Sequence, residues 1–185
     1  VENFRPGVMD RLKLGYETLS ALNPRLVFVS VTAFGGDGPY AKRPGFDPLL
    51  QAFSGIERAQ GGRYNPPTFM QIPITDHTTA LMQAATITLA LFNRERTGRG
   101  CHLNLSLLRT ALFINADAFV DFPGNPGKQL PDAGLHGLGP LDRMYQASDG
   151  WLFVVIPPDD AGWAALTSVP GVAHLAVDGR FAGAA

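Results

Sequence analysis

Asp76 is the residue whose type and position could do chemistry most directly, because it stands where a predicted helix begins. The dipole and free amides of a helix N-terminus favour an anion, so an aspartate with a reference pKa of about 3.9 stays ionised at neutral pH. An ionised carboxylate there could act as a nucleophile or serve only as a helix cap, and the pattern by itself favours the cap. The neighbouring His77 points elsewhere on a helix and is expected to be solvated or capping.

Other kinds of chemistry find little support in the sequence. The histidines and the one cysteine, Cys101, are not spaced as metal ligands, so we expect no metal. No serine stands in a nucleophile elbow, which argues against a serine hydrolase. The basic, glycine-containing segment 96–100 follows a predicted helix instead of preceding one, so we interpret it as a C-cap and turn and not as a phosphate loop.

The composition is that of an ordinary globular protein, with 45% hydrophobic and 17% charged residues among 185. A net charge of -1 and a pI of about 6.5 give no basic field for nucleic acid or anionic membrane, so we expect neither as a partner. No apolar run is long enough to cross a bilayer. One cysteine and no signal-peptide pattern predict a reducing, cytoplasmic setting.

The elements that would position Asp76 alternate between strands and helices. Residues 26–31 are apolar and rich in β-branched side chains, as in a strand of a parallel sheet covered on both faces. The glycine-rich loop 33–40 follows at the carboxyl end of that strand, where open α/β sheets bind ligands. Thr75 or Asp76 would cap a long helix that ends at Gly98.

The remaining segments continue this α/β pattern. Residues 59–67 carry paired glycines and paired prolines and are expected to form an exposed loop. The alternation over 102–107 predicts a strand with one polar face, and 108–122 suits a long helix. Residues 123–140 form a linker by composition, and 151–156 read as a second apolar strand.

Several short motifs stand in an order and at a spacing that resemble one known family. They are Val1–Leu12, Asn23-Pro24, Phe34-Gly35, Gly38-Pro39, Gly45–Gln51, Ile74–His77, Arg94–Gly100 and Tyr145–Trp151. Together they resemble the class III CoA-transferase family, to which formyl-CoA transferase, carnitine CoA-transferase and α-methylacyl-CoA racemase belong. The resemblance covers nearly the whole chain.

The resemblance implies an α/β architecture and a chain much longer than this one, which would then be a fragment. Residues 1–110 would be the C-terminal part of a large Rossmann-like, CoA-binding domain with an open parallel sheet. Residues 111–139 would be a helix and a Gly/Pro-rich linker, and residues 140–185 the start of a smaller α+β domain. The family further implies an interlocked homodimer, in which each chain threads through a ring made by the other.

The resemblance also implies an activity and assigns residues to it. Asp76 would be the nucleophile that moves coenzyme A from an acyl-CoA to a small carboxylic acid, through a mixed anhydride and an aspartyl-CoA thioester. The CoA contacts are carried onto Asn3, Phe4, Arg5, Arg11 and Arg43, whose aromatic and guanidinium groups suit adenine and phosphate. Gly137 and Gly139 are candidate amide donors to the oxyanion.

The position Gly45-Phe46-Asp47 separates two branches of the family. Racemases resemble Gly-His-Asp there, and their histidine moves the α-proton of the substrate. Phe46 cannot take up a proton, which disfavours racemase activity, and Asp47 is expected to be either a polar support near the site or a helix cap. The alternatives to a transferase are an acyl-CoA racemase with different bases, or a catalytically incomplete module that binds CoA or a partner chain.

Overall fold

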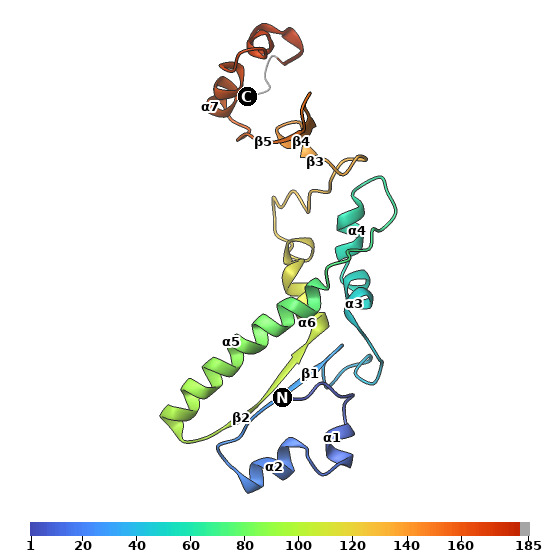
Figure 1. Ribbon diagram of the computed structural model, residues 1–185, viewed down its shortest axis with the longest axis vertical. Coiled ribbons are helices and arrows are strands. Elements are labelled where there is room, and N and C mark those ends of the chain that lie inside the picture. Colours follow the sequence, from blue (N-terminus) through green and yellow to red (C-terminus); the bar gives the residue numbers. More distant parts are fainter. Residues whose placement is uncertain (182–185) are drawn as a thin grey trace. The chain divides into compact units, whose positions relative to one another are not determined.

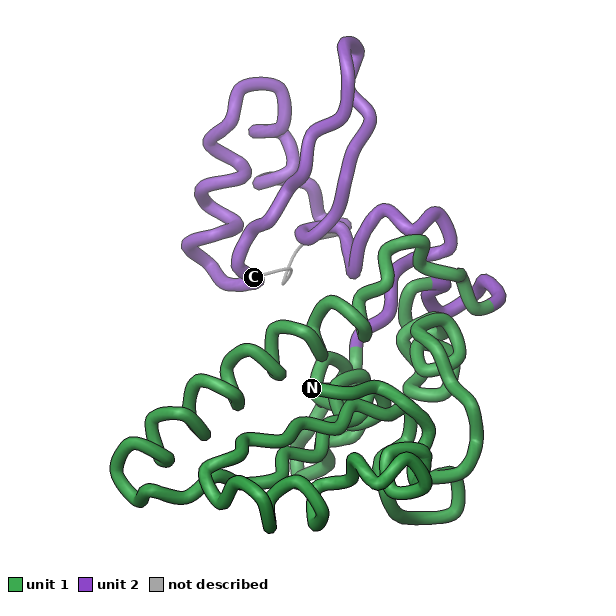
Figure 2. The backbone as a smooth tube through the Cα atoms, turned by 60° about the horizontal axis from the view of Figure 1, so that its bottom comes forward, with its two compact units in different colours: residues 1–60, 67–128 green, residues 61–66, 129–185 purple. Residues whose placement is uncertain are grey.

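The computed structural model describes residues 1–181, which form two compact units (Figure 2). Unit 1 comprises residues 1–60 and 67–128, and unit 2 comprises residues 61–66 and the chain from residue 129 onward. Unit 1 contains α1 (Val8–Arg11), α2 (Tyr16–Leu22), β1 (Val27–Thr32), α3 (Asp47–Phe53), α4 (Ile56–Gly61), α5 (Ile74–Thr97), β2 (Cys101–Ser106), α6 (Leu107–Ile114) and a 3-10 turn (Ala116–Ala118).

Unit 1 is built around two parallel strands, β1 and β2, paired from Val27 with Cys101 to Thr32 with Ser106. An isolated parallel bridge between Glu2 and Ser30 adds the start of the chain to the other edge of β1. Because the three segments are parallel, the residues that follow each of them leave the sheet at one edge. The predicted mixed α/β architecture with a parallel sheet is confirmed.

Helix α5 runs along one face of this sheet, and α2 meets the other face, where Tyr16 stacks on His102 (Figure 1). The predicted long helix is confirmed, and it ends as expected at Gly98, which has a φ of 72°. That left-handed conformation suits glycine, which lacks a Cβ. Within residues 1–181, α5 included, no helix has both the length and the apolar character needed to span a membrane.

The start of α5 differs from the prediction. The helix begins at Ile74 with Pro73 at the N-cap, so Thr75 and Asp76 occupy the first turn instead of capping it. Neither residue is therefore the cap that the sequence suggested. The acceptor that replaces them, Asp47, comes from another helix, α3.

Two further boundaries are wrong. The loop expected over 59–67 begins later, because α4 extends to Gly61. The helix expected over 108–122 ends at Ile114. At the end of α6 the Asn115 side chain donates to the Ser54 carbonyl oxygen at 2.8 Å and accepts from Lys128 Nζ at 2.6 Å. These two hydrogen bonds fix the chain at Asn115, and a 3-10 turn follows in place of further helix.

Unit 2 is an antiparallel sheet of three strands with helices. Its elements are β3 (Gly137–Gly139), β4 (Asp142–Gln146), β5 (Trp151–Val155), α7 (Asp160–Thr167) and two 3-10 turns (Ala173–Val177 and Gly179–Phe181). The predicted strand over 151–156 is confirmed as β5, whereas β3 and β4 were not predicted. The linker expected over 123–140 is wrong at its end, because β3 pairs with β4 there. Asp159 caps α7 by accepting from the Gly162 N–H at 2.7 Å.

Gly100 makes a close backbone contact that gives a stability prediction. A Cβ at this position would overlap the carbonyl oxygen of Leu26, and the Gly100 N–H donates to the Pro24 carbonyl oxygen at 2.8 Å. Gly100→Ala is expected to lower the free energy of unfolding of the protein by about 1–3 kcal/mol, because backbone must shift to admit the methyl group. Gly36→Ala is the control, since nothing lies within 4 Å of its Cβ position. Urea unfolding monitored by circular dichroism measures both, and equal midpoints would contradict the prediction.

Candidate active site

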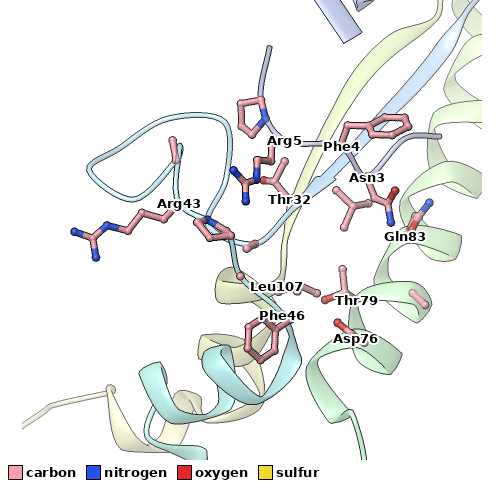
Figure 3. Close-up of a pocket in the computed structure, with 17 residues that line it drawn as sticks. Asn3, Phe4, Arg5, Thr32, Arg43, Phe46, Asp76, Thr79, Gln83 and Leu107 are labelled. Atoms are coloured by element: carbon pink, nitrogen blue, oxygen red, sulfur yellow. The ribbon is translucent and has the colours of Figure 1, made fainter. Parts of the chain in front are cut away.

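A pocket of about 410 Å³ lies at the carboxyl edge of the parallel sheet in unit 1 (Figure 3). Its walls are the segment 3–6 that follows the Glu2 bridge, the end of β1, the start of α6, the loop 43–46 and one side of α5. Loop 43–46 passes close to the end of β1 because Gly45 has no side chain, and a Cβ there would overlap Ala33. The sheet edge is therefore the floor of the pocket, as open α/β folds predict.

The pocket gathers six of the residues that the sequence singled out. They are Asn3, Phe4, Arg5, Arg43, Phe46 and Asp76. Four others do not line it. Asp47 lies behind the pocket at the start of α3, Arg11 lies on α1, and Gly137 and Gly139 lie on β3 of unit 2. The roles of Arg11 and of the two glycines stay predictions.

Asp76 presents a free carboxylate to the pocket. It is the third residue of α5, and its side-chain oxygens accept no hydrogen bond and form no ion pair within residues 1–181. Burial raises the pKa of Asp76, the negative charge of Asp47 raises it further, and His77 partly opposes this shift. The shift runs against the sequence argument, which expected free helix amides to favour the anion.

Asp47 explains why those amides do not act on Asp76. The Asp47 carboxylate is 3% exposed, and its Oδ2 accepts from the Thr75 N–H at 2.8 Å, the Thr75 hydroxyl at 2.6 Å and the Asp76 N–H at 2.9 Å. Its Oδ1 accepts from Gln51 Nε2. Burial alone would raise the pKa of Asp47, but these hydrogen bonds together lower it. Asp47 is therefore an ionised cap for α5 supplied by α3, a polar support behind Asp76.

Two polar pocket residues on α5 were missed by the sequence reasoning. Thr79 and Gln83 follow Asp76 by three and seven residues, so they lie on the same side of the helix and line the same pocket (Figure 3). Thr79 is 2% exposed and donates through its hydroxyl to the Thr75 carbonyl oxygen at 2.6 Å. The helical spacing from Asp76 was the signal that could have found them.

The remaining predicted pocket residues show how polar and aromatic groups frame the entrance. Phe46 is 64% exposed and lines the pocket close to Asp76 (Figure 3). The Arg43 guanidinium lies 4.9 Å from the centre of the Tyr40 ring, a cation–π contact. The Phe4 N–H donates to Glu2 Oε2 at 2.8 Å, which fixes the turn that presents residues 3–5.

No group of three His, Cys, Asp or Glu side chains suited to a metal ion occurs in the described part of the chain.

Comparisons with known proteins show the family to which the chain belongs. The chain belongs to CoA-transferase family III, whose model matches residues 1–185. It is 37% identical to an acetyl-CoA:oxalate CoA-transferase of Acetobacter aceti, over 97% of this chain and 46% of that protein. It is 35% identical to an acyl-CoA transferase of Fusarium pseudograminearum, over 98% of this chain and 40% of that protein.

A solved structure shares the fold. The crystal structure of a CAIB/BAIF family protein from Brucella suis matches with a TM-score of 0.80 and 32% identity, over 98% of this chain and 48% of that one. The chain thus spans less than half the length of these relatives. The resemblance inferred from the motifs is confirmed at the level of the family and its fold.

Proposed function

We propose that the protein carrying this chain is an acyl-CoA:carboxylate CoA-transferase, with Asp76 as its nucleophile. The observation that carries the proposal is the free Asp76 carboxylate in one pocket with Asn3, Phe4 and Arg5. The side chain of Asp76 is exposed and has no hydrogen-bond or ion-pair partner within residues 1–181. Its pKa is raised at a ligand-binding sheet edge, and such a combination favours a chemical role. The names of the relatives support CoA transfer as the reaction class.

The first half of the proposed reaction makes an enzyme-bound thioester. An Asp76 oxygen attacks the carbonyl carbon of the acyl-CoA, the carbon–sulfur bond breaks, and CoA leaves as a thiolate. The product on the enzyme is a mixed anhydride of Asp76 and the acyl group. The thiolate then attacks the Asp76 carbonyl carbon, the first acid leaves as a carboxylate, and an aspartyl-CoA thioester remains.

The second half reverses these steps with a new acid. The incoming carboxylate attacks the aspartyl thioester, releasing CoA thiolate and forming a second mixed anhydride. The thiolate attacks the acyl carbon of that anhydride, which yields the new acyl-CoA and restores the Asp76 carboxylate. No net proton transfer is needed, so the chemistry asks for a nucleophile and oxyanion donors, and Gly137 and Gly139 remain our candidates for the donors.

The proposed CoA contacts follow from residue chemistry at the pocket. Phe4 is 52% exposed and offers a ring face for adenine, and Arg5 offers a guanidinium for phosphate. We assign Asn3, Arg11 and Arg43 to the same cofactor-sized substrate. We further propose a cytoplasmic, interlocked homodimer as the working form, on the family resemblance.

Trapping of the covalent intermediate tests the function. The intact protein is incubated with an acyl-CoA, treated with hydroxylamine, and digested for mass spectrometry of the peptide that contains Asp76. We expect a hydroxamate on Asp76 that depends on the acyl-CoA. Exchange of the substrate α-proton with solvent deuterium, with no acceptor acid and no labelled Asp76, would instead identify a racemase. CoA binding with neither signal would identify a binding module.

A further inference from the structure

The first turn of α5 is unusual because every one of its free N–H groups already has an acceptor. A helix normally leaves its first four N–H groups without helical partners, and an acidic side chain in the first turn commonly receives them. Here the N-cap Pro73 has no N–H, and the acceptors for the other three groups are the Ile72 carbonyl for Ile74 at 2.8 Å and Asp47 Oδ2 for Thr75 at 2.8 Å and for Asp76 at 2.9 Å. The Asp76 carboxylate therefore has no N–H group of this turn to bind.

Asp47 is also held firmly enough to fix the turn. Its carboxylate is almost fully buried, and both of its oxygens are hydrogen-bonded, to Thr75 and Asp76 on one side and to Gln51 on the other. Gln51 is fully buried and donates in addition to the Ile72 carbonyl oxygen at 3.2 Å. A charge buried in this way is tolerated only with its hydrogen bonds complete, so α3 and the start of α5 are tied together at this point.

We propose that Asp47 is a positioning residue for the transfer reaction: by taking the first-turn N–H groups of α5, it keeps the Asp76 carboxylate unbound and directed into the pocket. The inference rests on the proposed function, since it concerns how that nucleophile is presented. Asp47 does not line the pocket and acts only through Asp76 and Thr75. A carboxylate already engaged as a cap would have to give up those hydrogen bonds before it could attack a thioester.

The charge of Asp47 gives the role a measurable signature. The charged groups that act on Asp76 are Asp47 from α3 and His77 from its own helix, and Arg5 and Arg43 are the other charged residues that line the pocket. After burial, Asp47 is the main cause that raises the pKa of Asp76. Removing the negative charge at position 47 favours the Asp76 anion and so lowers the pKa of Asp76. The acid limb of the activity profile must then move to lower pH.

Asp47→Asn in the intact protein tests the proposal. We expect kcat to fall about 100-fold with KM for the acyl-CoA within about threefold, because a loosened turn misplaces the nucleophile. We also expect the acid limb of kcat/KM to shift to lower pH. Asp117→Asn is the matched control, since it makes the same charge change outside the pocket and should leave kcat and the acid limb unchanged. The proposal would be overturned if Asp47→Asn had the kcat and the acid limb of the wild type. It would also be overturned if less of the Asp47→Asn protein were folded while the acid limb stayed in place, because Asp47 would then have a structural role only.

Thr75→Val provides a second test if Asp47→Asn does not fold. It removes only the hydroxyl donor to Asp47 and keeps the charge, so we expect kcat to fall about 3- to 10-fold with the acid limb in place. An unchanged kcat in this variant would overturn the positioning role. Hydroxylamine trapping separates the two proposals. An unlabelled wild-type Asp76 rejects the proposed function itself, whereas a labelled one with unaffected variants rejects only the role of Asp47.

Discussion

Replacement of Asp76 by asparagine is expected to reduce kcat/KM for CoA transfer by at least about 10³-fold, because a neutral side-chain amide cannot replace the carboxylate as the nucleophile that attacks the thioester. The fold should survive. Asp76 makes no side-chain hydrogen bond or ion pair within residues 1–181, and burial and the charge of Asp47 disfavour its anion. We therefore expect the free energy of unfolding to stay equal or to rise slightly. Steady-state assays and urea unfolding on the same preparations measure both quantities.

The control for this substitution is Asp121→Asn, an exposed aspartate that does not line the pocket. It should retain the kcat/KM of the wild type. Substantial transfer activity in purified Asp76→Asn would mean that another group attacks the thioester. Loss of activity accompanied by loss of folded structure would mean that Asp76 has a structural role, contrary to the contacts described above.

The parts of the fold that sequence reasoning predicted well depend on local pattern. The strand at β1 was predicted from a run of β-branched residues, and the long helix α5 from apolar spacing and a terminal glycine. The ligand-binding edge followed from a general rule of parallel sheets. This rule also explains the gathering of Asn3, Phe4 and Arg5, since the Glu2 bridge places them beyond the same edge as the end of β1.

The parts that were missed depend on contacts between residues far apart in the chain. Asp47 lies 28 residues before Thr75, so no pattern around Asp76 reveals that the helix amides are already bound. That contact supplies the cap that was expected from Thr75 or Asp76. After burial, the charge of Asp47 is also the second cause that raises the pKa of Asp76, against the expected direction. The early end of α6 has a similar cause, because the Asn115 side chain binds the carbonyl of Ser54, 61 residues earlier.

Replacement of Arg5 by leucine is expected to raise KM for the acyl-CoA about 10- to 100-fold and to leave kcat within about threefold. The Arg5 guanidinium forms no hydrogen bond or ion pair in the described part of the chain, and Arg5 lines the pocket that holds Asp76. A hydrogen bond between two charged groups contributes about 1.5–3 kcal/mol, and every 1.4 kcal/mol is a factor of ten. Binding of the phosphates should therefore weaken while the chemical step stays intact.

An acyl-pantetheine thioester, which lacks the nucleotide and its phosphates, makes this prediction specific. With that substrate the wild type and Arg5→Leu should show the same kcat/KM, because there is no phosphate for the guanidinium to bind. Arg99→Leu is the control for the loss of a positive charge, since Arg99 is exposed and does not line the pocket. If the defect of Arg5→Leu persisted with acyl-pantetheine, or if Arg99→Leu showed the same rise in KM, Arg5 would not be a phosphate contact and the nucleotide would have to bind elsewhere.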